Sequence, residues 1–248
     1  MPTKRTYHMF ILSGVFAIAM GFLEAIVVVY LRKIYYPWGF DFPLQAISSG
    51  MLSLELYREI CTMVMLVIIA LIAGKNRLQK FTWFIYCFAI WDIFYYVGLK
   101  LFLNWPPSLL TWDILFLIPV PWISPVLAPV VCSLTMILLA VCIVVLQVKG
   151  HDVRIKFLEW GLIIGGGVVI FISFIRDYSQ IIAQEGLLGK VLALPKDQRF
   201  YQAMAQYQPV DFAWSLFIFG EILILLSITM IVIRIKKKDK PERLLEVK

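Results

Sequence analysis

Charged residues are scarce in this sequence. They make up 16% of its 248 residues, whereas hydrophobic residues make up 61%, and the mean hydropathy is +0.86. A soluble domain carries about 25% charge, so the composition excludes an ordinary soluble protein and predicts an integral membrane protein surrounded by lipid. The formal net charge of +7 does not indicate a nucleic-acid partner, because the basic residues form short clusters between apolar runs.

Histidine and cysteine are also few, and this limits the chemistry. The two histidines are His8 and His151, and the four cysteines lie inside apolar runs without metal-ligand spacing. The sequence contains no Walker, Gly-x-Ser-x-Gly or His-Glu-x-x-His motif. We therefore expect no haem, zinc or nucleotide site, whereas a site built from carboxylates would suit a hard divalent cation such as Mg²⁺, Ca²⁺ or Mn²⁺.

Long apolar runs are abundant, and six of them reach the length of about 20 residues that a membrane-spanning helix needs. They cover residues 9–31, 50–73, 81–103, 124–148, 157–177 and 212–234. The fold class expected is an all-α integral membrane protein, a single bundle of six transmembrane helices.

Residues 104–123 are apolar enough to be mistaken for a seventh span. The basic clusters at 75–80 and 149–156 should share one side of the membrane, which requires an even number of crossings between them. The prolines and tryptophans of 104–123 favour a re-entrant or interfacial segment between the third and fourth helices.

The basic residues also predict the orientation of the chain. With six spans, fifteen lysines and arginines fall on the side of both termini and six on the other side. We expect both termini to be cytoplasmic in a bacterial-type plasma membrane, with a basic tail at 235–248. The hydrophilic residues 178–211 would form an outer interfacial segment.

Several ionisable and polar side chains interrupt the apolar runs and are the candidate ion- or substrate-binding residues. They are Glu24, Glu55, Arg58, Glu59, Asp92, Tyr96 and Glu221, with Asp113 in the re-entrant segment. Three of them, Glu55, Arg58 and Glu59, share one helix face because they lie three and four residues apart. Asp113 would either cap a short helix or point into a cavity.

Glu24, Glu59, Asp92 and Glu221 should lie at one level, about 10–17 Å below the outer boundary at 1.5 Å per helical residue, with Glu55 about one turn above Glu59. Five span acids face one span arginine, an imbalance that protonation, a bound cation or water must relieve. If a metal binds, its ligands would be Glu59, Asp92 and Glu221.

Three functions fit this pattern. The first is proton- or cation-coupled transport of a small or lipid-like molecule. The second is an intramembrane enzyme that acts on a lipid or isoprenoid, with carboxylates as metal ligands or as acid and base. The third is a non-catalytic subunit or assembly factor, in a homo-oligomer or a larger membrane complex, whose polar residues join helices.

Overall fold

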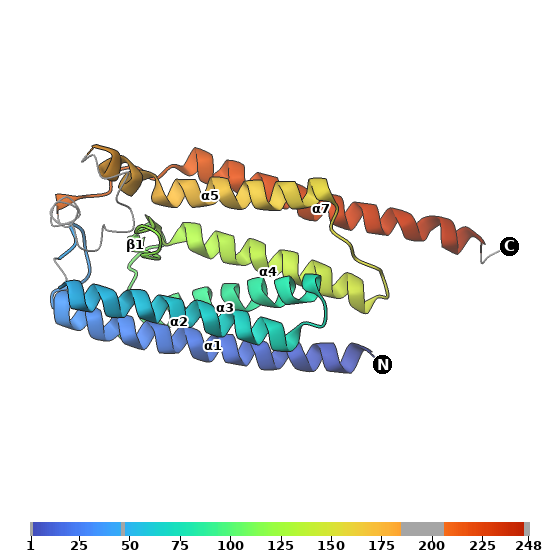
Figure 1. Cartoon of the computed structure of the whole chain (residues 1–248), viewed down its shortest axis with the longest axis horizontal. Coiled ribbons are helices and arrows are strands. Elements are labelled where there is room, and N and C mark those ends of the chain that lie inside the picture. Colours follow the sequence, from blue (N-terminus) through green and yellow to red (C-terminus); the bar gives the residue numbers. More distant parts are fainter. Residues whose placement is uncertain (1, 46–47, 185–205, 246–248) are drawn as a thin grey trace.

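Six long helices form the chain in the computed structural model, which describes residues 2–45, 48–184 and 206–245. All six are long and apolar enough to cross a membrane, so the chain is an integral multi-pass membrane protein, as its sequence predicts. The helices run side by side along the long axis of the molecule (Figure 1). Their bounds are α1 (Pro2–Tyr35), α2 (Ser49–Ala73), α3 (Arg77–Leu103), α4 (Leu127–Val148), α5 (Phe157–Gln184) and α7 (Trp214–Leu245).

The helix bounds differ from the predicted spans mainly at the two ends of the chain. The first helix begins at Pro2, and the last continues to Leu245, so most of the predicted basic tail is helical. The predicted outer segment 178–211 begins as a continuation of α5 to Gln184. Residues 185–205 of that segment lie outside the described residues.

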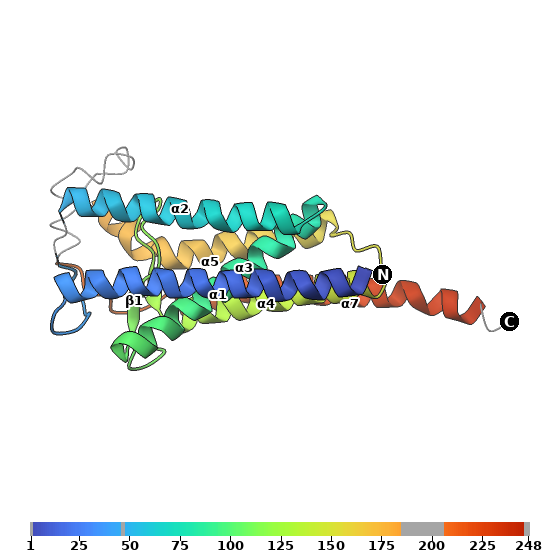
Figure 2. The ribbon, with the colours of Figure 1, turned by 90° about the horizontal axis from the view of Figure 1, so that it is seen from below.

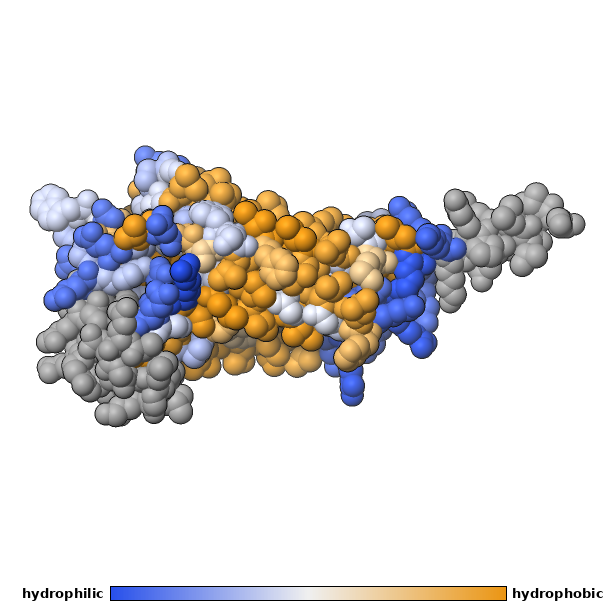
Figure 3. All heavy atoms as spheres, turned by 90° about the horizontal axis from the view of Figure 1, so that it is seen from above, coloured by the Kyte–Doolittle hydropathy of each residue, from blue (hydrophilic) through white to orange (hydrophobic). Residues whose placement is uncertain are grey.

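An apolar belt surrounds the middle of the bundle. Figure 3 shows it on one face as a broad hydrophobic band between two hydrophilic ends. Large apolar side chains are exposed on several helices, among them Ile72 at 70%, Leu134 at 56% and Ile164 at 59% exposure. A soluble protein seldom exposes a continuous apolar surface of this kind, whereas lipid covers it at no cost.

Both termini lie at the same end of the bundle, as an even number of crossings requires (Figures 1 and 2). The opposite end carries the connections after α1 and α3 and the start of α7 (Figure 1). We call these the terminal end and the loop end. At the terminal end, α3, α4 and α7 meet in an apolar core that includes Ile85, Ile143 and Ile231.

Local sequence explains where the helices begin and end. The Ser48 hydroxyl accepts a hydrogen bond from Met51 N (3.3 Å) at the start of α2, and the Asn76 side chain accepts one from Gln79 N (2.9 Å) at the start of α3. Asn104 ends α3 in the left-handed conformation (φ 52°), which asparagine tolerates better than most residues.

Helices α1 and α3 approach each other closely, and this positions the candidate site at the loop end. A Cβ atom at Gly98 of α3 would lie 2.6 Å from Ala25 Cβ of α1, and one at Gly21 would lie 2.6 Å from the Trp91 carbonyl oxygen. Small residues permit such contacts, which form the usual interface between helices in lipid.

The segment between α3 and α4 contains a short two-stranded antiparallel sheet, a small addition to the helical bundle that the sequence predicts. Strands β1 (Trp112–Ile114) and β2 (Ile123–Pro125) pair with Asp113 opposite Ser124. Bonds from Leu115 N to Trp122 O (2.8 Å) and from Trp122 N to Phe116 O (2.7 Å) extend the pairing. Proline lacks the N–H that a helix needs, so a proline-rich segment forms a hairpin more readily than a helix.

Candidate functional site

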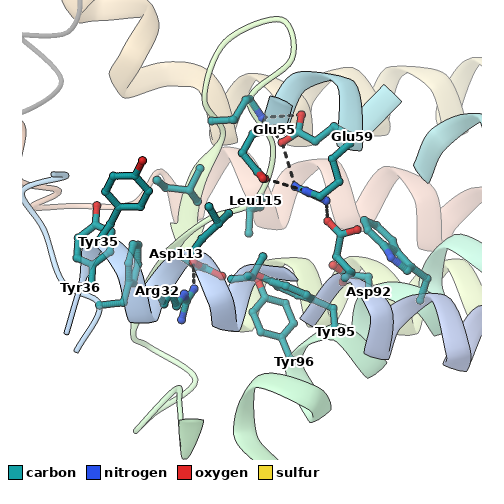
Figure 4. Close-up of a pocket in the computed structure, with 18 residues that line it drawn as sticks. Arg32, Tyr35, Tyr36, Glu55, Glu59, Asp92, Tyr95, Tyr96, Asp113 and Leu115 are labelled. Carbon is teal, nitrogen blue, oxygen red and sulfur yellow. Dashed lines mark hydrogen bonds and ion pairs between the residues drawn. The ribbon is translucent and has the colours of Figure 1, made fainter. Parts of the chain in front are cut away.

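A polar cavity of about 140 Å³ lies at the loop end, between α1, α2, α3 and the β1–β2 hairpin (Figure 4). Seven of the eight residues that the sequence singles out line it, and Glu221 does not. The seven are Glu24, Glu55, Arg58, Glu59, Asp92, Tyr96 and Asp113.

Arg58 is the centre of the charge cluster in this cavity. Its Nε donates to Glu55 Oε2 (2.7 Å), its Nη1 forms an ion pair with Glu24, and its Nη2 lies 3.9 Å from Glu59 Oε1. The Thr62 hydroxyl, one turn further along α2, donates to Glu24 Oε2 (3.1 Å). One guanidinium therefore joins three carboxylates from two helices.

Glu59 connects the helices to the hairpin. Its side chain is almost buried, and both of its oxygens accept from Leu117 N, at 3.0 and 3.1 Å. Hydrogen bonds from a backbone N–H favour the ionised form of a carboxylate, whereas burial opposes it. Glu59 thus fixes the chain after β1 against α2.

Asp92 of α3 lies at another wall of the cavity and accepts a hydrogen bond from the Ser133 hydroxyl of α4 (2.8 Å). Tyr95 and Tyr96, one turn further along the same helix, also line the cavity. No arginine or lysine forms an ion pair with Asp92 among the described residues, so this carboxylate has a hydroxyl partner but no counter-charge.

Arg32 forms the second charge pair of the cavity. Its Nη2 donates to Asp113 Oδ1 (2.8 Å), and its guanidinium carbon lies 4.2 Å from the Phe40 ring centre and 3.8 Å from that of Trp105. Stacking on aromatic faces and pairing with a carboxylate are both typical of a buried arginine. Asp113 is therefore directed into the cavity, one of the two positions that its sequence allows.

Burial raises the pKa of Asp113 to about 6, although the positive charge of Arg32 and hydrogen bonds to the ionised form oppose the rise. Desolvation is thus the larger effect at this position, since it disfavours the charged carboxylate. Asp113 is a group that can change its charge near neutral pH.

Arg32 was not among the candidate residues expected from the sequence; it is one of the six basic residues counted on the side opposite the termini. The structure places it in the last turn of α1, with only 6% of its surface exposed. A signal was available, because Arg32 follows Glu24 by eight residues and residues four apart share a helix face. Arg32 and Glu24 thus both face the cavity.

Glu221 lies apart from the cavity, contrary to the expected layer of acids on four spans. Its Oε2 accepts from the Thr135 hydroxyl of α4 (2.7 Å), and the residue is only 6% exposed. The proposed metal ligands Glu59, Asp92 and Glu221 are therefore not assembled in one cavity. Within the described part of the chain, no group of three His, Cys, Asp or Glu side chains is arranged to hold a metal ion.

The charge of the cavity is unbalanced. Among the described residues that line it are five carboxylic acids and two arginines, a surplus of three negative charges if every group were ionised. Two buried donors, Arg32 Nη1 and Trp91 Nε1, have no hydrogen-bond partner in the described part of the chain. The cavity can thus accept positive charge and also offer hydrogen bonds to water or to a bound molecule.

Another ion pair, which the sequence did not lead us to expect, lies at the other end of the bundle. Arg234 of α7 donates from Nε and Nη2 to the two oxygens of Glu159 on α5, both at 2.8 Å, and Glu159 is 2% exposed. Glu159 also accepts from Lys156 N (2.7 Å) at the start of α5. This pair joins two adjacent helices near the terminal end, so a structural role explains it.

Comparison of the chain with models of protein families, with curated proteins and with solved structures finds no match. The function must therefore be inferred from the cavity itself.

Proposed function

We propose that this protein is a carrier that binds a proton or a cation in the acidic cavity and couples its movement to that of a small or lipid-like molecule. The observation that carries the proposal is the surplus of carboxylates over guanidiniums in one cavity. A charge buried at membrane depth costs about 2.5–3.5 kcal/mol even on the lenient scale from insertion experiments. A proton or a cation would remove that cost, and its release would restore it.

The carboxylates differ in how firmly they are held, which suits reversible binding. Glu24 and Glu55 pair with Arg58, and Asp113 pairs with Arg32, whereas Asp92 has only a hydroxyl donor. Asp92 is thus the carboxylate for which a proton or cation would make the largest difference. We propose that it carries the coupling ion, with Glu59 as a second carboxylate of the same cavity.

The orientation of the carrier follows from the basic clusters. With the terminal end in the cytoplasm, the cavity opens toward the outer side, and the β1–β2 hairpin acts as a re-entrant element that covers it. The apolar core of α3, α4 and α7 closes the cytoplasmic half. Transport would require that core to open in a second conformation.

An intramembrane enzyme that acts on a lipid is the second candidate, and one observation favours it. Glu59 lines the polar cavity and also an apolar groove on the outside of the bundle. A carboxylate at such a boundary is placed to act as an acid or a base on the polar end of a lipid.

The test is ion movement in proteoliposomes. Vesicles that enclose a pH-sensitive dye would be given gradients of Na⁺, K⁺, Mg²⁺ and tetramethylammonium in turn. A carrier that exchanges protons for the imposed cation should change the internal pH, and Asp92→Asn should abolish the change. Asp211→Asn should leave it intact, because Asp211 is an exposed acid outside the cavity. Wild-type vesicles that behave like protein-free vesicles under every gradient would refute proton-coupled transport of these cations.

A further inference from the structure

An apolar groove lies beside the acidic cavity and shares Glu59 with it. It has a volume of about 470 Å³ and lies between α2, α3 and the hairpin. Its lining residues are Glu59, Ile60, Met63, Val64, Val67, Ile68, Phe88, Phe116, Ile118 and Trp122. Nine of these ten are apolar, and the groove is within the size range of small-molecule sites.

The groove opens toward lipid along one face of α2. Ile60, Val64 and Ile68 line it and are 48%, 54% and 49% exposed, so they are not covered by other helices. They lie four residues apart on one helix face and span about 12 Å at 1.5 Å per residue. An extended apolar chain lying along α2 would cover this face.

Glu59 marks the junction between the groove and the polar cavity. It lines both, and its two oxygens accept from Leu117 N. Leu117 lines the cavity, whereas its neighbours Phe116 and Ile118 line the groove. The dividing wall is thus the short strip 116–118, held at its centre by Glu59. A molecule with its polar head in the cavity and its chain in the groove would pass this carboxylate.

The charge of the cavity indicates the charge of the head. Among the described lining residues the two cations are both already paired, Arg58 with three carboxylates and Arg32 with Asp113. An anionic head would add to the negative surplus, whereas a cationic head would reduce it. Tyr35, Tyr95 and Trp91 also line the cavity and are of the type that binds ammonium groups through their ring faces.

We propose that the cavity and the groove together bind a cationic amphiphile with a single apolar chain, an alkylamine or alkylammonium. The ammonium head lies among the carboxylates near Asp92 and Glu59, and the chain follows α2 past Val64. This inference rests on the proposed cation-binding function of the cavity and names the class of its substrate.

The experiment compares two probes with the same head. Binding of tetramethylammonium and of hexyltrimethylammonium would be measured by calorimetry on the full chain in phosphatidylcholine nanodiscs. Burial of the added methylenes should make the hexyl probe bind at least about tenfold more tightly. Hexanoate, which has a chain but an anionic head, should bind at least about tenfold more weakly than the hexyl cation.

Variants separate the head site from the chain site. Val64→Trp fills the groove and should remove the advantage of the hexyl chain without weakening tetramethylammonium binding. Ile72→Trp is the matched control, since Ile72 lies on the same helix, is 70% exposed and does not line the groove. Asp92→Asn should weaken both cations.

Each contrary outcome has a distinct meaning. Equal affinities for the two cations would overturn the chain site but not the cation site. An equal loss of hexyltrimethylammonium affinity in Val64→Trp and Ile72→Trp would do the same. Hexanoate binding as tight as that of the hexyl cation would overturn the assigned head. Thermal stability that depends on pH, without binding of either cation, would overturn the amphiphile while a proton-coupled carrier remains. A protein that responds to neither pH nor any cation would refute the proposed function together with this inference.

Discussion

Replacing Arg58 with alanine should destabilise the protein more than replacing any exposed arginine. The guanidinium pairs with Glu24 and Glu55 and lies 3.9 Å from Glu59, and its side chain is 20% exposed. Without it, three nearly buried carboxylates from α1 and α2 would face one another without their counter-charge. They would have to take up protons or draw in water.

The size of the effect follows from the burial of the partners. Side-chain exposure is 11% for Glu24 and Glu55 and 5% for Glu59. Removing one member of a buried ion pair costs about 3–5 kcal/mol. For a chain of this length, 1 kcal/mol corresponds to about 2–4 °C in Tm, so we expect Tm to fall by roughly 6–20 °C.

Thermal melts followed by tryptophan fluorescence in detergent would measure this change. Arg154→Ala is the control, because Arg154 is 83% exposed and its ion pair with Asp152 is solvated; its Tm should change by less than about 2 °C. The loss in Arg58→Ala should be smaller at pH 5 than at pH 8, because protonation removes the repulsion between the carboxylates. Equal Tm values for the two alanine variants at pH 8 would refute the role of Arg58 as the central counter-charge.

Three further predictions concern other parts of the fold. Gly98→Ala should destabilise the α1–α3 contact by about 1–3 kcal/mol in thermal melts, whereas Gly165→Ala, where a Cβ atom meets open space, should change stability by less than about 1 kcal/mol. Burial raises the pKa of Asp113 to about 6, so protonation of this group stabilises the folded state. That contribution is complete below the ordinary pKa of 3.8 and is lost as the pH rises to about 6. Asp113→Asn should therefore flatten the dependence of Tm on pH between these two values, and an unchanged dependence would contradict the assignment. Arg234→Ala leaves the buried Glu159 carboxylate without its charged partner and should cost about 1.5–3 kcal/mol, and a Tm equal to wild type would show that the pair is solvated.

Much of the fold was predictable because membrane helices are defined by length and hydropathy alone. All six spans were predicted, and the predicted bounds of α2, α3 and α4 agree with the structure to within a few residues. The ends of these three helices coincide with capping residues, prolines or charged loops. The β1–β2 hairpin was not predicted. Its strands are three residues long, and their pairing depends on contacts between positions about ten residues apart. Periodicity cannot reveal so short a sheet.

The sequence predicted most of the residues that line the cavity, but not which side chains they contact. Buried acids in apolar runs are costly, which is why seven of the eight expected side chains meet in one cavity. The rise per residue along a helix says nothing about rotation around its axis. Glu221 accordingly faces Thr135 of α4 and does not line the cavity. Arg32 was not expected at the site because it lies in the last turn of α1, where a basic residue is usually solvated.

The central claim is that the cavity binds a proton or a cation, and thermal stability measured against both is its most direct test. Melts of the wild type would be recorded from pH 5 to 9, with and without Na⁺, Mg²⁺, Ca²⁺, Mn²⁺ and tetramethylammonium. A cation present at 100 times its Kd should stabilise the protein by about 2.7 kcal/mol, or roughly 5–11 °C in Tm, and Asp92→Asn should remove that gain. If a proton fills the site instead, Tm should depend on pH and the Asn variant should match or exceed the wild type. A wild-type Tm that responds to neither pH nor any cation, with Asp92→Asn and Glu59→Gln identical to it throughout, would contradict the claim.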